Sequence, residues 1–140
     1  MQKGKLKKNV RPPVTQKSQP GLEFRMNPKP EFAGNKMVKR LFNKTALITG
    51  GDSGIGRAVA VAFAREGCNI AIVYLNENKD AGRTKFKAEK YGQKCILLPG
   101  DIRNEKFCRT SVNKAYREFK RLDILVNNAA VQFPQTTIEN

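Results

Sequence analysis

The sequence predicts an α/β fold with a doubly wound parallel sheet, and two observations favour this class. From Leu41 onward, short apolar runs alternate with longer amphipathic stretches, which is the pattern of βαβ units. A glycine-rich run, Thr-Gly-Gly-Asp-Ser-Gly-Ile-Gly at positions 49–56, separates the first apolar run from the first amphipathic stretch. Right-handed crossovers between parallel strands then give the strand order 3-2-1-4, which is the first part of such a sheet.

The apolar runs predict the strands. They occupy residues 45–49, 70–74, 95–98 and 124–127, and each is short and continuous. Strands covered by helices on both faces have this composition, whereas a sheet with one solvated face shows alternating polarity. The fourth strand is expected at the edge of the sheet.

The amphipathic stretches predict helices over residues 54–67, 79–91 and 105–121. Gly67 is the expected C-terminal cap of the first helix. Three- and four-residue spacing predicts that this helix buries Ile55, Ala58, Val59, Ala62 and Phe63. By the same spacing, the third helix buries Phe107, Cys108, Ser111, Val112, Ala115, Tyr116 and Phe119.

The glycine-rich run indicates a phosphate-binding turn. Glycine lets the backbone approach a pyrophosphate closely, and the start of the following helix offers unpaired N–H groups and a partial positive charge. Gly56 is followed by Arg57-Ala58, where a Walker loop has Lys and then Ser or Thr, so hydrolysis of ATP or GTP is not expected. A tight strand-to-helix turn that binds no ligand is the structural alternative.

Three motifs, in this order, resemble those of the short-chain dehydrogenase/reductase family. The run from Thr49 to Gly56 is similar to its signature Thr-Gly-x-x-x-Gly-x-Gly, and Gly100-Asp101-Ile102 follows the third strand. Residues 123–130 resemble the strand that ends in Asn-Asn-Ala-Gly, with Ala130 in place of the last Gly. The resemblance covers residues 41–140. It implies the N-terminal part of an NAD(P)-binding, Rossmann-type domain with the first four strands of an otherwise larger sheet.

The resemblance also implies the function of an NAD(P)-dependent oxidoreductase that interconverts an alcohol and a carbonyl. Two short runs near the N-terminus resemble the arm of one subgroup of the family, the bacterial glucose/ribitol-dehydrogenase-like proteins that include general stress proteins. These runs are Gln19-Pro20-Gly21 and the Met-Asn-Pro-Lys-Pro sequence at 26–30. The expected partner is a small-molecule alcohol or carbonyl substrate. A homo-oligomer is expected only of a longer, full-length protein.

By resemblance, the first cofactor contacts come from the glycine-rich turn. Ser53 and Ile55 would supply backbone N–H groups to the pyrophosphate, and Asp52 and Ser53 would offer side-chain contacts. At the end of the second strand, the position that selects between NAD and NADP falls on Tyr74, which carries no charge. Glu77 lies close in sequence, so both cofactors stay open, with dual use or a preference for NADP.

The later contacts would come from the ends of the third and fourth strands. Asp101 would bind the adenine amine with Ile102 against the ring, although a helix-capping role is the alternative for Asp101. Asn127 and Asn128 would tie the fourth strand to its neighbours, and the backbone at Ala129 would pass near the cofactor ribose. The predicted cofactor-binding set is Gly50, Asp52, Ser53, Gly54, Ile55, Gly56, Tyr74, Leu75, Asp101, Ile102, Asn127, Ala129 and Ala130.

No catalytic residue is assigned. Family members use a Tyr-x-x-x-Lys pair with a Ser and an Asn, and these groups follow the Asn-Asn-Ala-Gly segment. Tyr116 and Lys120 have the right spacing, but they precede the fourth strand, and Tyr116 is expected in the core. The chain is therefore interpreted as the cofactor-binding half of the enzyme. A non-catalytic dinucleotide-binding module or a decayed enzyme is the alternative.

Composition sets further expectations. Residues 1–40 hold 11 of the 27 Lys and Arg and two acids, so they carry nine of the net 15 positive charges and predict a basic, flexible arm. Its charges are scattered among Pro, Gln and Asn without a nucleic-acid motif, so only weak, non-specific nucleic-acid binding is expected. Neither a signal peptide nor a membrane segment is predicted. Three cysteines without Cys-x-x-Cys spacing, and no histidine, indicate no metal site and a reduced, cytoplasmic setting.

Overall fold

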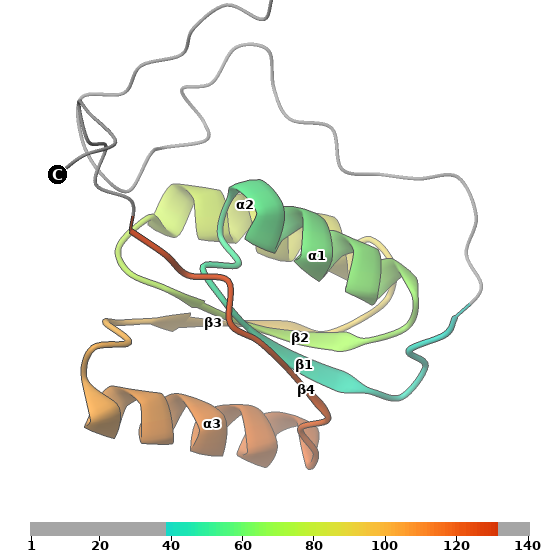
Figure 1. Ribbon diagram of the computed structural model, residues 1–140. Helices are drawn as coiled ribbons and strands as arrows, with labels where there is room; N and C mark the ends of the chain where they lie inside the picture. The colour runs from blue at the N-terminus through green and yellow to red at the C-terminus, as the bar shows by residue number, and fades with distance from the viewer. Residues whose placement is uncertain (1–38, 132–140) are drawn as a thin grey trace, which may run out of the picture.

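A computed structural model describes residues 39–131, and its sheet has the predicted topology (Figure 1). The elements are β1 (Thr45–Thr49), α1 (Gly54–Arg65), β2 (Asn69–Tyr74), α2 (Asn78–Glu89), β3 (Cys95–Pro99), α3 (Glu105–Phe119) and β4 (Ile124–Val126). All strand pairs are parallel and the order is β3-β2-β1-β4. The α/β class and the order 3-2-1-4 are therefore confirmed. Of the predicted arm, residues 1–38 lie outside the described residues, as does the subgroup resemblance at 19–30.

The sheet is covered on both faces, with α1 and α2 on one side and α3 on the other (Figure 1). Alternate strand residues point to opposite faces. Ile48, Ile70 and Ile72 are fully buried in the core cluster that includes α1 and α2 residues, whereas Leu47 and Val73 pack in the cluster that includes Ala115 of α3. This two-sided burial explains why β1 and β2 are continuous apolar runs. Within residues 39–131, no helix is long and apolar enough to cross a membrane.

The buried face of α1 differs from the predicted one. The structure buries Gly56, Arg57, Ala60, Val61 and Ala64, whereas Ile55 is 77% exposed. Val59 and Phe63 are only partly buried against the core. The helix packs against α2 as well as the sheet, so its small residues and one arginine lie inside. The spacing of apolar residues did not identify this face, because a hydrophobicity pattern assigns a charged residue such as Arg57 to the surface.

The third helix also departs from its prediction. Only Ser111 and Ala115 of α3 are buried, while Val112 is 43% and Tyr116 is 58% exposed. The expectation of a core tyrosine is therefore wrong. Among the described helices, α3 alone covers its face of the sheet (Figure 1), so only the line of residues that faces the strands is enclosed. The helix ends at Phe119, where Lys120 adopts a left-handed φ of 60°.

Asp123 fastens the start of β4 to the start of β1. Its carboxylate accepts hydrogen bonds from Arg121 at 2.7 and 2.8 Å and from the Thr45 N–H at 2.9 Å. Lys44 lies 3.6 Å away. The Arg121 hydrogen bonds, followed by the Thr45 bond, hold the pKa of Asp123 well below its ordinary value of 3.8.

Replacing Asp123 with asparagine is expected to make stability less dependent on acid pH. Because the folded pKa is depressed, the charged form stabilises the fold above the unfolded pKa of about 3.9, and this contribution is lost as the pH falls toward the folded value. Urea unfolding of the parent and of Asp123→Asn is therefore expected to differ most at pH 7 and to differ less at pH 3, which lies below the unfolded pKa. Glu118→Gln, a change at an exposed residue of α3, is the control. An equal difference in unfolding free energy between the parent and Asp123→Asn at both pH values would contradict a stabilising role for the Asp123 charge.

Candidate dinucleotide-binding site

The predicted site residues come together at one edge of the sheet. Because the strands are parallel, their carboxyl ends share an edge, and ligands of open α/β sheets bind outside that edge. Four segments follow these ends: the glycine-rich turn after β1, Tyr74 and Leu75 at the end of β2, Asp101 and Ile102 after β3, and residues 127–130 after β4.

Two glycines bring the turn into contact with the end of β4. Gly50 has a left-handed φ of 62°, and a Cβ there would stand 3.0 Å from the Ala129 Cα. A Cβ on Gly56 would overlap the Gly50 carbonyl oxygen and would stand 2.6 Å from the Asn128 Nδ2. The close approach of three backbone segments therefore requires glycine at both positions.

Hydrogen bonds to β1 fix the end of β4. The Asn128 side-chain amide donates to the carbonyl oxygens of Thr49 at 3.1 Å and Gly50 at 3.0 Å. The backbone N–H groups of Asn128 and Ala129 both donate to the Thr49 hydroxyl at 3.0 Å. The prediction that a side-chain amide connects the end of β4 to its neighbour is confirmed for Asn128. Asn127 is exposed. Sequence reasoning gave Thr49 no role, although this residue is the first of the glycine-rich motif.

The start of α1 is open to a ligand. Its N-cap residue, Ser53, makes no side-chain capping hydrogen bond, and the first turn contains no acidic residue. Gly54 has a φ of 50°, and a Cβ there would meet nothing within 4 Å. The first turn of α1 thus places no acidic side chain at the positive end of the helix dipole, and helix starts of this kind bind phosphate groups.

Asp52 places a carboxyl in the turn without exposing it. The residue is 6% exposed, and burial raises the pKa of its carboxyl, with smaller raising effects from Glu77 and Asp80. Hydrogen bonds from its own backbone and from Ser53 oppose this rise. Burial therefore removes the one acid of the turn from the exposed surface that a pyrophosphate would approach.

The end of β2 presents no charge of its own. Tyr74 is 6% exposed, and its hydroxyl donates to the Asn78 Oδ1 at 2.7 Å. Burial, followed by the charge of Asp52, raises the Tyr74 pKa. Leu75 is 44% exposed. The position that the sequence predicts to select between the cofactors therefore holds a buried, neutral tyrosine, and Leu75 after it is apolar and partly exposed.

Asp101 does not cap a helix. The N-cap of α3 is Asn104, whose side chain accepts from the Phe107 N–H at 3.2 Å. Asp101 instead accepts from the Arg103 side chain at 2.6 Å and from its N–H at 2.9 Å, and these bonds lower the pKa of its carboxyl. The capping alternative is wrong, and an ionised hydrogen-bond acceptor lies beside Ile102, which is 42% exposed.

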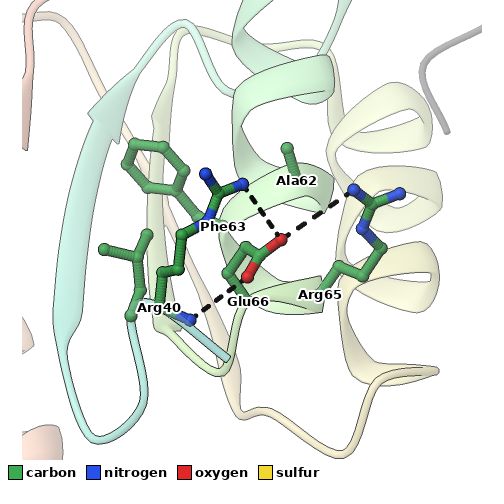
Figure 2. A pocket seen from close by; sticks show the side chains of 6 residues that line it. Arg40, Ala62, Phe63, Arg65 and Glu66 are labelled. Atoms are coloured by element: carbon green, nitrogen blue, oxygen red, sulfur yellow. Dashed lines mark hydrogen bonds and ion pairs between the residues drawn. The ribbon is translucent and has the colours of Figure 1, made fainter. Parts of the chain in front are cut away.

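Other features lie away from this edge. Helix α3 starts after the carboxyl end of β3 and ends before the amino end of β4, so its C-terminal end lies toward the opposite edge of the sheet (Figure 1). Tyr116 belongs to the last turn of this helix, and Lys120 is its C-cap. A pocket at the end of α1 is lined by Arg40, Phe63 and Glu66 among others (Figure 2). Arg40 and Arg65 approach the Glu66 carboxylate to 3.4 and 3.9 Å. The one carboxylate of this pocket is therefore paired with two arginines.

Sequence reasoning missed the support beneath the turn. Arg57, Asp80 and Thr84 form a buried polar cluster under the Asp52 carbonyl. No sequence motif includes these residues. Asp80 and Thr84 lie on α2, outside the glycine-rich run, and the charge of Arg57 favours a surface position in a hydrophobicity pattern. With this support, the open helix start and the close glycine contacts, the residues present fit a dinucleotide.

The chain matches a known family of proteins along its sequence. The family model described as short chain dehydrogenase matches residues 44–140. The oxidoreductase YhxC of Bacillus subtilis is 55% identical over 133 residues, which are 95% of this chain and 47% of the relative. General stress protein 39 of B. subtilis is 52% identical, covering 92% and 46%. The glucose and ribitol dehydrogenase of Daucus carota is 40% identical, covering 92% and 47%.

Solved structures agree with these matches. A short chain dehydrogenase from Burkholderia cenocepacia in complex with NADP is 37% identical with a TM-score of 0.64, covering 66% of this chain and 38% of that one. An NAD+-bound xylitol dehydrogenase is 28% identical with a TM-score of 0.63, covering 66% and 35%. This chain thus spans about half the length of the curated relatives it matches. It belongs to the short-chain dehydrogenase/reductase family, whose cofactors are NAD or NADP.

Proposed function

We propose that this chain provides the cofactor-binding part of an NAD(P)-dependent oxidoreductase that interconverts an alcohol and a carbonyl. The observation that carries the proposal is the start of α1, where Ser53 makes no side-chain capping hydrogen bond, next to a turn whose glycines admit close contact. The relatives are oxidoreductases and dehydrogenases by name. We further propose a small-molecule substrate, a cytoplasmic location and, for a full-length protein, a homo-oligomer. Residues 1–40 would form a basic arm and residues 41–140 part of the NAD(P)-binding domain.

The bound nicotinamide cofactor would supply or accept the hydride. This chain's residues would bind and orient it. The helix start would stabilise the charge of the pyrophosphate, Asp101 would accept a hydrogen bond from the adenine amine, and Ile102 would cover the ring. The segment from Asn127 to Ala130, held by Asn128, would line the ribose.

Titration of the 140-residue chain with NADH and NADPH, followed by nicotinamide fluorescence, tests the proposal. Saturable binding that ADP displaces is expected, because ADP carries the pyrophosphate and adenine. Absence of displaceable binding by either cofactor would contradict it. A second candidate, a non-catalytic dinucleotide-binding module, is favoured by the position of Tyr116 and Lys120 away from the cofactor edge. Both candidates expect binding without turnover from the 140-residue chain, so the native polypeptide purified from its source is assayed with aldehydes and sugars: turnover would support the oxidoreductase, and binding without turnover would support the module.

Replacing Leu75 with arginine is expected to shift cofactor preference toward NADP. The half-exposed position follows the neutral Tyr74, so a guanidinium there would reach a 2′-phosphate. A charge-assisted hydrogen bond of this kind is expected to lower the Kd of NADPH about tenfold and to leave that of NADH nearly unchanged. Leu75→Gln is the uncharged control. An equal change in the NADPH Kd for both variants, or a gain in NADPH affinity that does not depend on salt, would refute an electrostatic origin.

A further inference from the structure

Three donors converge on one carbonyl oxygen of the glycine-rich turn. The Asp52 carbonyl accepts from Arg57 Nη2 at 2.6 Å, from Arg57 Nε at 3.1 Å and from the Thr84 hydroxyl at 2.8 Å. Arg57 lies in the first turn of α1, whereas Thr84 lies on α2. The turn is therefore fastened to two helices through a single backbone atom.

The donors are themselves held by a third residue. Arg57 Nη2 lies 3.2 Å from the Asp80 carboxylate and 3.1 Å from the Asp80 carbonyl, and Arg57 Nε is 2.7 Å from the Thr84 hydroxyl. Arg57, Asp80 and Thr84 are 3%, 1% and 0% exposed. Burying an arginine is costly unless it is paired and hydrogen-bonded, and here Nε and Nη2 of the guanidinium donate to groups of Asp52, Asp80 and Thr84. Arg57 and Thr84 both approach the Asp52 carbonyl more closely than the Asp80 carbonyl, which lies 3.1 and 3.2 Å from them.

Fixing this carbonyl also fixes the next N–H group. A peptide unit is planar and trans, so its C=O and N–H point in opposite directions. Since the Asp52 oxygen is held toward the buried cluster, the Ser53 N–H of the same peptide is directed away from it. Ser53 is the N-cap residue at the open start of α1, where the pyrophosphate is proposed to bind.

We propose that Arg57, Asp80 and Thr84 are positioning residues for the cofactor. Their buried cluster locks the peptide between Asp52 and Ser53 so that the Ser53 N–H is aimed at the pyrophosphate. The inference rests on the proposed function, because it takes the turn to be the pyrophosphate site. It adds two residues of α2 that lie outside every cofactor motif of the chain.

Thr84 offers the cleanest test, because valine keeps its shape without the hydroxyl and serine keeps the hydroxyl. Two quantities are measured: the hydrogen-exchange rate of the Arg57 amide in the ligand-free chain, and the Kd of NADH. The Arg57 N–H donates to the Ser53 carbonyl at 3.0 Å, so its exchange reports opening of the chain at Ser53. Thr84→Val is expected to raise both about fivefold, the effect of one lost hydrogen bond, and Thr84→Ser is expected to restore both. Ala88→Gly, at a buried residue in the last part of α2, is the control for general destabilisation and should leave Arg57 exchange unchanged.

The proposal is overturned if Thr84→Val is folded and leaves Arg57 exchange unchanged, or if Ala88→Gly raises that exchange equally. If the valine variant does not fold, Thr84→Ala takes its place under the same criteria. The exchange measurement needs no ligand. Failure of the parent chain to bind NADH would therefore refute the proposed function, while Arg57 exchange would still decide whether the cluster orders the turn.

Discussion

Replacing Gly56 with alanine is expected to abolish dinucleotide binding and to destabilise the chain by about 3 kcal/mol, as an overpacked site without room to relax does. The added methyl would overlap the Gly50 carbonyl and crowd the Asn128 side-chain amide. Both neighbours are fixed, since Asn128 also holds the end of β4 to β1. The overlap could be relieved only by moving the glycine-rich turn or by separating the end of β4 from β1. Either movement would deform the proposed pyrophosphate site.

Gly82→Ala is the matched control for this change. Gly82 lies within α2, and a Cβ there would meet nothing within 4 Å. Alanine in a helix interior is more favourable than glycine by about 0.5–1 kcal/mol, so the control is expected to be stabilised and to bind NADH like the parent. Urea unfolding and NADH titration of both variants measure the two effects. Normal binding by Gly56→Ala would show that the close approach is dispensable.

The topology was predictable because it depends on features that a sequence displays directly. β1 and β2 are buried on both faces and therefore read as unbroken apolar runs. Gly50 and Gly56 are required by a left-handed φ and by a backbone contact, and no other residue type meets those needs. The order 3-2-1-4 then follows from the handedness of crossovers. These constraints act locally or through chain connectivity, so spacing alone reveals them.

The errors arose where a residue's environment depends on elements distant in sequence. Ile55 is apolar at helical spacing, but it lies at the open start of α1 and is exposed. Arg57 is charged and yet buried, because Asp80 lies on the neighbouring helix. Tyr116 lies on the apolar stripe of α3, but the described structure has no second helix beside it on that face. Periodicity describes one helix at a time, and burial is decided by what packs against it.

The buried pair of Arg57 and Asp80 is expected to dominate the stability of the α1–α2 layer. Burial lowers the Arg57 pKa, and the hydrogen bond that Arg57 donates to Asp80, followed by the charge of Asp80, opposes that effect. Asp80→Asn removes the charge but keeps the shape, which leaves the guanidinium buried without its carboxylate. Breaking a buried pair in this way costs about 3–5 kcal/mol. Arg83, 3.7 Å from Asp80 and half exposed, can turn to solvent instead.

Glu89→Gln provides the comparison on the same helix. Glu89 pairs with Lys85 at 3.7 Å, but both side chains are more than 40% exposed, so the loss is expected to be about 0.3–0.5 kcal/mol. The double variant Arg57→Leu with Asp80→Leu should lose less than the two single changes combined, because neither charge is then left buried alone. Urea unfolding of the full set at pH 7 measures these differences. If Asp80→Asn cost no more than Glu89→Gln, the guanidinium would have to be solvated in the native state, and the cluster could not hold the Asp52 carbonyl in place.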